Sequence, residues 1–194
     1  MKCRILKFLQ DADDILSGEQ MSVLLGVSRV SVWKHIHSLQ AAGYPIESTP
    51  KGYRLTDRPD VLQPWGFPGR ENRMHCRSAV DSTMAIARQL ARDGCPEVTV
   101  VTADRQTQGR GRLGRVWYSG LGGLYFTIVL RPALPAQLSS LTTFAAGLTW
   151  ARLLNETYGI DTGLKWPNDL LVGERKLSGM LSEMEAQGEM VTFV

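Results

Sequence analysis

The chain has 194 residues, of which 43% are hydrophobic, and its formal net charge is +3. This length suits one or two domains, and the apolar fraction suffices for a globular core that does not depend on disulfide bonds or bound metal ions. The mild positive charge permits a nucleic acid or phosphate partner without requiring one. No window approaches the ~20 apolar residues of a membrane span, so we expect no membrane partner.

The cysteines and the N-terminus bear on the compartment. Cys3, Cys76 and Cys95 lie far apart, form no Cys-x-x-Cys pair and are odd in number, which favours a reducing compartment. The apolar stretch after the basic start is broken by Lys7 and is too short for a signal sequence. We therefore expect a cytoplasmic protein.

The first sixty residues predict three short helices. Apolar residues recur at helical spacing between positions 5 and 9 and predict the first. Ser17, with Gln20 three residues later, has the form of a capping box, and the helix that follows ends at Gly26. Ser28 begins a third helix, which ends at Gly43. Its apolar stripe consists of Val32, Ile36 and Leu39.

Two short helices joined by a tight glycine turn indicate a helix-turn-helix, and two strands at 45–48 and 52–55 add a wing. The third helix would enter the major groove of DNA. The candidate DNA-binding residues point away from the apolar stripe or lie at the tip of the wing: Arg29, Ser31, Trp33, Lys34 and Lys51. The alternative for such a charged helix face is ordinary solvation.

A stretch rich in proline and glycine follows and predicts a linker. We assign residues 1–58 to a winged helix-turn-helix domain, 59–71 to the linker and 72–194 to a second domain. In that domain strands are expected at 75–80, 98–103, 124–130, 164–166, 170–172, 177–184 and 190–194, the last after a turn at Gln187-Gly188. Helices are expected at 82–92 and 138–158, the second with Leu141, Phe144, Leu148 and Ala151 on its packed face.

This order predicts an α+β fold: a winged helix-turn-helix followed by a mixed sheet with helices on one face. The sequence stops at Phe193-Val194, within an apolar strand. We therefore expect a second domain that is incomplete at its C-terminus.

The most informative motif is the segment 104–115, which holds four arginines and three glycines and no acid after Asp104. Glycines let the backbone approach a ligand closely, and arginines supply forked donors for carboxylate or phosphate. We expect a loop that is mobile when empty and ordered by an anion. It lacks the Gly-Lys-Ser/Thr of a phosphate-binding Walker loop. An RNA-binding tract is the alternative.

Two further segments carry polar groups. Lys165 begins Lys-Trp-Pro-Asn-Asp at a predicted strand end, where its charge could face a cleft or could simply be solvated. Asp81-Ser82-Thr83 stands at a predicted helix start, whose hydroxyls and backbone N–H groups can bind a polar ligand or can form a simple cap. His35 and His37 have no partner at ligand spacing, so no metal-ligating cluster is expected.

These motifs resemble those of a known family. The run SGEQMSVLLGVSRVSVWKHIHSLQAAGYPIESTPKGYRL, residues 17–55, is similar to the N-terminal domain of the bifunctional biotin ligase/repressors, with Trp33 where a small polar residue is typical. GRGRLGRVW, KWPND and RKLSGMLSE follow in the order of the biotin protein ligase catalytic domain, from about residue 75 to 184. Lipoate ligases share this fold but lack the Gly-Arg-Gly-Arg loop.

The resemblance implies roles for particular residues. Biotin would contact Ser82, Thr83, Gln106 and also Met84, which stands where Asn is frequent in the family. Arg110, Gly111 and Arg112 would close over the biotin carboxylate and the adenylate phosphate, and Lys165 would bridge the two. Arg110, Arg112 and Lys165 are thus the expected catalytic residues.

The resemblance also implies an activity. Biotin, ATP and Mg²⁺ would yield biotinyl-5′-AMP, and a lysine of the biotin carboxyl carrier protein of acetyl-CoA carboxylase would then accept the biotin. The adenylate would act as co-repressor of a homodimer on operator DNA. Two alternatives remain open: a non-catalytic, biotin-responsive repressor, and a lipoyl-group ligase.

Overall fold

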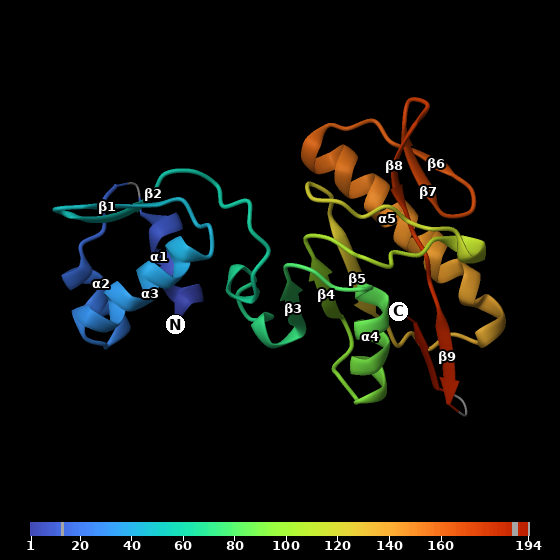
Figure 1. Ribbon diagram of the computed structural model, residues 1–194, viewed down its shortest axis with the longest axis horizontal. Coiled ribbons are helices and arrows are strands. Elements are labelled where there is room, and N and C mark those ends of the chain that lie inside the picture. The colour runs from blue at the N-terminus through green and yellow to red at the C-terminus, as the bar shows by residue number, and fades with distance from the viewer. Residues whose placement is uncertain (13, 188–189, 194) are drawn as a thin grey trace. The chain divides into compact units, whose positions relative to one another are not determined.

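The computed structural model describes residues 1–12, 14–187 and 190–193. It divides into two compact units, Met1–Cys76 and Arg77–Val194. Among the described residues no helix has the length and apolar character needed to cross a bilayer. Figure 1 shows the elements of each unit with the labels used below.

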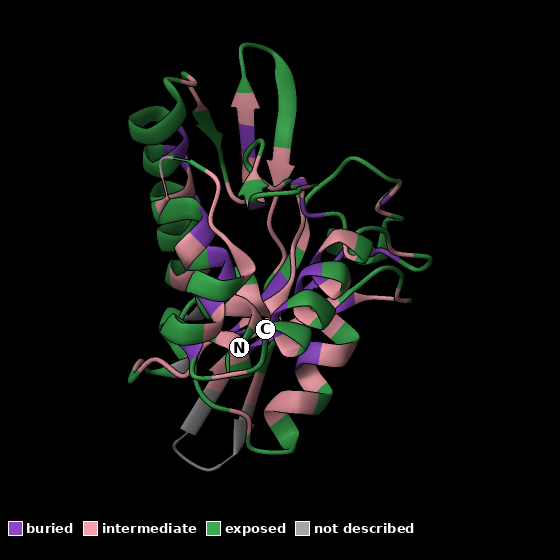
Figure 2. Cartoon of the chain, turned by 90° about the vertical axis from the view of Figure 1, so that its left-hand side faces the viewer, coloured by how far each residue is buried: buried purple, intermediate pink, exposed green. Residues whose placement is uncertain are grey.

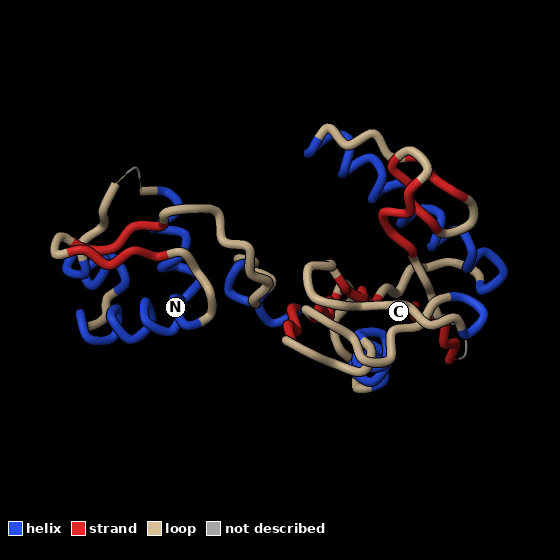
Figure 3. Tube along the Cα trace, turned by 45° about the horizontal axis from the view of Figure 1, so that its top comes forward, coloured by secondary structure: helices blue, strands red, loops and turns tan. Residues whose placement is uncertain are grey.

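The first unit contains three helices and a two-stranded antiparallel wing, drawn by element type in Figure 3. The Ser17 hydroxyl accepts a hydrogen bond from the Gln20 backbone N–H, and the Ser17 backbone N–H donates to the Gln20 side-chain oxygen, so the predicted capping box is confirmed. Gly26 ends the second helix in the left-handed conformation, at φ 68°. The elements are α1 (Lys2–Asp11), α2 (Gly18–Leu25), α3 (Arg29–Ala41), β1 (Ile46–Thr49) and β2 (Gly52–Leu55).

The core of the first unit is the predicted apolar stripe of α3, packed against the inner faces of α1 and α2. Val32, Ile36 and Leu39 are completely buried. Figure 2 colours the chain by burial, and buried, intermediate and exposed residues alternate along its helices. The stripe therefore fixes which face of α3 is turned to solvent.

The segment predicted to be a linker, 59–71, belongs to the first unit instead. Val61 and Trp65 pack against the core of that unit, and the Lys2 ammonium lies 3.9 Å from the centroid of the Trp65 ring. Two short 3-10 helices, Pro64–Gly66 and Glu71–Arg73, give the segment a defined course. The proline and glycine content indicated a break in regular structure. The apolar residues of the segment nevertheless pack against the core of the first unit.

The second unit confirms the α+β class, with strands in small sheets beside two helices. One three-stranded sheet has the order β3-β4-β5 and another the order β6-β7-β8, and β9 pairs with β10. Strand β3 (Met74–Arg77) spans the boundary between the units. The elements after it are α4 (Thr83–Arg92), β4 (Thr99–Ala103), β5 (Tyr125–Val129), α5 (Ser139–Tyr158), β6 (Gly163–Lys165), β7 (Asp169–Val172), β8 (Arg175–Gly179), β9 (Met184–Gln187) and β10 (Met190–Phe193).

Helix α4 organises this unit. Ala87 packs with Val101 of β4 and Val129 of β5, all completely buried. On its other side α4 holds the segment before β9 and β9 itself through two ion pairs, Arg88–Glu183 at 2.7 Å and a bidentate Arg92–Glu185 pair. The hydrogen bond from Arg92 lowers the pKa of the Glu185 carboxyl.

The predicted strand at 177–184 is wrong in extent, because β8 ends at Gly179 and β9 begins at Met184. Residues 180–183 between them line the cavity described below. The predicted turn at Gln187-Gly188 falls partly outside the described residues.

The predicted packed face of α5 is right at Ala151, which is buried, and wrong at the other three positions. Leu141, Phe144 and Leu148 are exposed, whereas Gly147 and Leu154 are buried. An added Cβ on Gly147 would lie 2.9 Å from the Met180 Cε and 3.1 Å from the Leu164 side chain. Small residues therefore allow the close packing of α5, and the pattern of large apolar residues did not predict this face.

A core substitution tests the packing of the first unit. We expect Ile36→Ala to lower the free energy of unfolding by about 2–5 kcal/mol, because it empties a completely buried site in α3. Chemical denaturation followed by circular dichroism measures this. The matched control is Val23→Ala on α2, whose side chain is 73% exposed and which should change stability by roughly 0.5 kcal/mol or less. Equal effects of both changes would contradict the assigned core.

Candidate ligand-binding site

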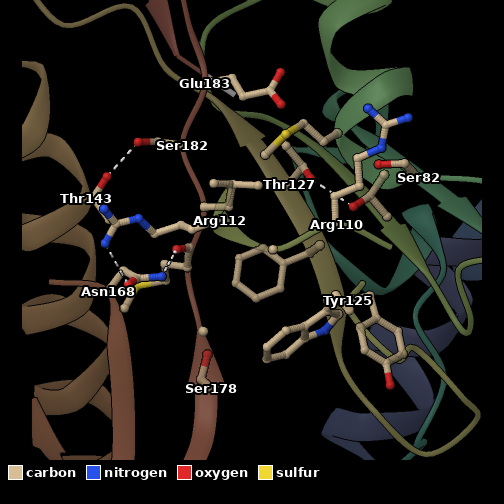
Figure 4. Close-up of a pocket in the computed structure, with 18 of the residues that line it drawn as sticks. Ser82, Arg110, Arg112, Tyr125, Thr127, Thr143, Asn168, Ser178, Ser182 and Glu183 are labelled. Atoms are coloured by element: carbon tan, nitrogen blue, oxygen red, sulfur yellow. Dashed lines mark hydrogen bonds between the residues drawn. The ribbon is translucent and has the colours of Figure 1, made fainter. Parts of the chain in front are cut away.

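A cavity of about 1220 Å³ lies in the second unit. Its walls come from the start of α4, the loop between β4 and β5, the strand β5, one side of α5, and the segments around β7 and β8. Figure 4 shows residues of these elements converging on it. The cavity is large enough for a ligand beyond ordinary drug size.

A chain of hydrogen bonds fixes the floor of the cavity. Thr83 donates from its backbone N–H and its hydroxyl to the Gln106 side-chain oxygen, at 2.8 and 3.1 Å. The hydroxyls of Thr83 and Thr127 are 2.8 Å apart, and the Gln106 amide donates to the Ser119 hydroxyl at 3.0 Å. Because its amide oxygen already accepts two bonds, Gln106 is held in one orientation. Its second amide hydrogen remains available to a ligand.

The helix start contributes a free hydroxyl. Ser82 is the N-cap of α4, as predicted, but its side chain makes no capping hydrogen bond. The neighbouring Asp81 is engaged instead, since it accepts from the Thr107 hydroxyl at 2.6 Å. Ser82 and Met84 both line the cavity. The predicted simple cap at this helix is therefore not formed by the Ser82 side chain.

The Gly/Arg loop is a hairpin in the structure. The backbone of Gln106 pairs with that of Ser119, that of Gly109 with Trp117, and that of Gly111 with Arg115. An added Cβ on Gly109 would lie 2.5 Å from the Trp117 carbonyl oxygen and 2.6 Å from the Ser119 hydroxyl. Only glycine permits this close approach, so Gly109 sets the path of the loop over the cavity.

The hairpin brings two arginines to one cavity. Arg110 and Arg112 both line it, together with Gly111 between them. Arg112 donates to the Asn168 side-chain oxygen at 3.3 Å, a bond drawn in Figure 4. Neither arginine forms an ion pair with any described residue. Two uncompensated guanidinium groups suit an anionic ligand.

Lys165 does not face the cavity, which differs from the expectation that its charge faces a cleft. It ends β6 and is exposed, and it does not line the cavity. Its strand partner Asp169 does line it. The lysine in the lining is Lys176 of β8, whose ammonium lies 2.7 Å from the Asp169 carboxylate and 4.9 Å from the centroid of the Trp117 ring.

The acids of the cavity are all engaged by protein groups. Glu183 pairs with Arg88, Asp169 with Lys176, and Asp81 accepts from Thr107. Among the described residues no group of three or more His, Cys, Asp or Glu side chains could hold a metal ion.

Sequence reasoning missed several polar residues of the site. Thr127 in the lining and Ser119 behind it complete the hydrogen-bonded floor, and the hydroxyls of Thr143 and Ser182, both in the lining, lie within hydrogen-bond distance of each other at 2.6 Å. Thr142 also lines the cavity, with a buried hydroxyl that lacks a hydrogen-bond partner among the described residues. A polar residue inside the apolar strand 124–130 was an available signal for Thr127. The residues on α5 had none, because its packed face was misassigned.

The first unit places the predicted DNA-binding residues on two elements. Arg29, Trp33 and Lys34 are exposed on α3, and Lys51 is exposed in the turn between the wing strands. Ser31 is only partly exposed, and its backbone N–H donates to the Ser28 cap. The Arg29 guanidinium lies 3.5 Å from the Glu19 carboxylate, with both side chains exposed.

The fold and the cavity together define a two-unit protein that joins a winged helix-turn-helix to an α+β ligand-binding unit suited to an anion. Family models agree: residues 77–194 match the biotin/lipoate A/B protein ligase family, and residues 3–54 match an HTH domain. The chain therefore belongs to the biotin/lipoate A/B protein ligase family.

Individual relatives have both parts. The bifunctional ligase/repressor BirA of Bacillus subtilis (strain 168) is 38% identical over 195 residues, which cover 96% of this chain and 60% of that protein. The protein of the same description from Escherichia coli (strain K12) is 33% identical, covering 87% of this chain and 53% of its own length. The chain thus spans between half and two thirds of these curated relatives.

A solved structure matches the second unit in fold. The biotin protein ligase of Leishmania major, in complex with biotinyl-5-AMP, superposes with a TM-score of 0.52 at 28% sequence identity. The match covers 62% of this chain and 54% of that one. A ligase that binds an acyl-adenylate thus shares the fold that carries the cavity here.

The close approach at Gly109 makes a prediction about the loop. We expect Gly109→Ala to lower the free energy of unfolding by about 1–3 kcal/mol, because the new methyl group meets the Trp117 carbonyl and forces the hairpin apart. Thermal unfolding of the second unit measures this. The control is Gly111→Ala in the same loop, where the nearest atom would be 3.6 Å away. A melting temperature unchanged by Gly109→Ala would contradict the hairpin.

Proposed function

We propose that this protein is a biotin protein ligase that forms biotinyl-5′-AMP from biotin and ATP and transfers biotin to a lysine of a biotin carboxyl carrier protein. The observation that carries the proposal is that two arginines without an ion pair among the described residues, Arg110 and Arg112, line a cavity with an oriented polar floor. The family membership and the fold shared with an adenylate-binding ligase support it.

The polar floor suits the ureido group of biotin. A ureido group has one carbonyl acceptor and two N–H donors, and the free Gln106 amide hydrogen and the Ser82 and Thr83 hydroxyls offer both kinds of partner. Met84 and Trp117 add apolar wall beside these groups. In this arrangement the carboxylate end of biotin extends toward the arginine hairpin.

The hairpin suits the reacting end. A biotin carboxylate oxygen attacks the α-phosphorus of ATP, the bond from that phosphorus to the bridging oxygen breaks, and pyrophosphate leaves with the electron pair. A lysine amine then attacks the acyl carbon, and AMP leaves. The first step brings together two anionic groups that repel one another, so Arg110 and Arg112 lower its barrier by neutralising charge in place. When bound, Mg²⁺ would add charge neutralisation on the phosphates.

The first unit supports a second role, binding of operator DNA by the winged helix-turn-helix. Cations on α3 and at the wing tip, Arg29, Lys34 and Lys51, suit phosphate contacts. A homodimer would place two copies of α3 on a palindromic site. Biotinyl-AMP in the cavity would act as co-repressor.

The charged residues of the site give the first test. We expect Arg110→Ala, Arg112→Ala and Lys165→Ala each to lower pyrophosphate release about 10²–10³-fold, as the loss of one charge-stabilising donor typically does. Lys165 has no ion pair among the described residues and is free to turn to an anion. Lys176 is already neutralised by Asp169, so Lys176→Ala should cost less. Release is measured with saturating biotin and ATP.

The control is Arg152→Ala on α5, an exposed arginine outside the cavity, which should release pyrophosphate at the parent rate. Calorimetric titration with biotin, lipoate and then ATP separates the alternatives. Biotin binding without pyrophosphate release would favour a non-catalytic repressor, and lipoate binding in place of biotin would favour a lipoyl ligase. Near-normal rates in Arg110→Ala and Arg112→Ala would reject the site.

The co-repressor role makes a separate prediction. We expect operator affinity to rise when biotin and ATP are added together, because the adenylate orders the hairpin and favours the dimer. Coupling of this kind is typically five- to 150-fold. Electrophoretic mobility shifts with and without both ligands measure it, and Arg112→Ala should abolish the increase while retaining basal binding. Equal affinity in both conditions would remove the coupling.

A further inference from the structure

The outer face of α3 is unusual for a helix that would contact DNA. Its exposed positions follow helical spacing at Val30, Trp33, Lys34 and His37, opposite the buried stripe. Val30 is 62% exposed and Trp33 is 50% exposed. Much of the face that would enter a groove is therefore apolar or aromatic.

The exposed indole is held in place. The ring centroids of Trp33 and His37, one helical turn apart, lie 4.2 Å from each other with the rings tilted by 55°. Val30 lies one turn before Trp33, in the first turn of α3, where recognition helices make their base contacts. An ordered apolar surface thus lies at the end of the helix that is closest to the bases.

Amide side chains, which commonly contact adenine, are not available on this face. Gln40 is the amide residue of α3, and it donates to the Ile46 carbonyl at 2.7 Å and to the Ser48 hydroxyl at 3.2 Å. Polar contacts to bases are left to Arg29, Ser31 and Lys34. The apolar pair has one natural partner in the major groove, the C5-methyl group of thymine.

We propose that Val30 and Trp33 contact thymine methyl groups, so that this helix selects its operator by apolar contact as well as by hydrogen bonds. The proposal rests on the proposed binding of DNA by the first unit. Charge favours DNA as the occupant of this face, since α3 carries Arg29 and Lys34 and no acid. The cations provide affinity for phosphate without sequence preference, and the apolar pair provides the preference.

The test removes the methyl group and nothing else. The full chain, with biotin and ATP present, selects duplexes from a random pool, and the preferred duplex is resynthesised with deoxyuridine at individual thymine positions. We expect at least one position at which the change weakens binding about fourfold, which corresponds to one buried methyl group. Fluorescence anisotropy of labelled duplexes measures the affinity.

Variants assign the effect to these side chains. In Val30→Ala and Trp33→Ala the deoxyuridine penalty should vanish at the matching position, while overall affinity falls for the thymine duplex only. Val23→Ala, an exposed apolar change on α2, should retain the full penalty. Both α3 positions are exposed, so the variants should keep the circular dichroism and melting temperature of the parent.

The outcomes separate the two proposals. Salt-dependent binding of a selected duplex with no deoxyuridine penalty would overturn the thymine contact and leave DNA binding intact. Failure to enrich or bind any duplex would overturn the DNA-binding role and the contact with it. Self-association that is lost in Trp33→Ala, together with binding unaffected by the change, would assign this face to a second copy of the chain and overturn the contact.

Discussion

The proposed chemistry depends on one constraint, that cationic side chains are gathered on a short hairpin without acids to balance them. Arg110 lies on one arm of the hairpin, opposite Val116, and Arg112 lies at its turn, and neither pairs with a carboxylate in the described part of the chain. Positive charge without a counter-charge raises the free energy of the empty site, and an anion lowers it. An anionic ligand would therefore balance the positive charge of the loop. A neutral ligand of the same shape would leave the electrostatic free energy of the loop unchanged.

The hairpin and the polar floor are parts of one arrangement. Gln106 pairs through its backbone with Ser119 and through its side chain with Thr83 and again with Ser119. The residue that orients the floor thus also anchors the base of the arginine hairpin. A ligand that contacts the free Gln106 amide hydrogen touches the element that positions the cations. Binding at the polar end and neutralisation at the charged end are therefore mechanically linked within the second unit.

Features fixed by local chemistry could be predicted from the sequence. The Ser17 capping box, the glycine stop at Gly26 and the buried stripe of α3 follow from rules that involve neighbours within one turn. The convergence of Ser82, Gln106 and Arg112 followed from family motifs rather than from spacing. Lys165, the packed face of α5 and the course of 59–71 depend on contacts between distant segments. Gly147 allows close contact between α5 and distant residues, and Trp65 packs a proline-rich stretch against the core of the first unit. The local sequence pattern predicts neither contact.

In the first unit, different residues would provide affinity for DNA and selectivity between DNA sequences. The Arg29–Glu19 pair is exposed on both sides, and exposed pairs contribute at most about 1 kcal/mol. A phosphate can therefore displace Glu19 at little cost and recruit Arg29 to the DNA backbone. Val30 and Trp33 have no such partner to lose, and they gain only where an apolar group meets them. Salt would thus weaken binding to every sequence alike, whereas the difference between sequences would persist, since burial of a methyl group is not screened by ions.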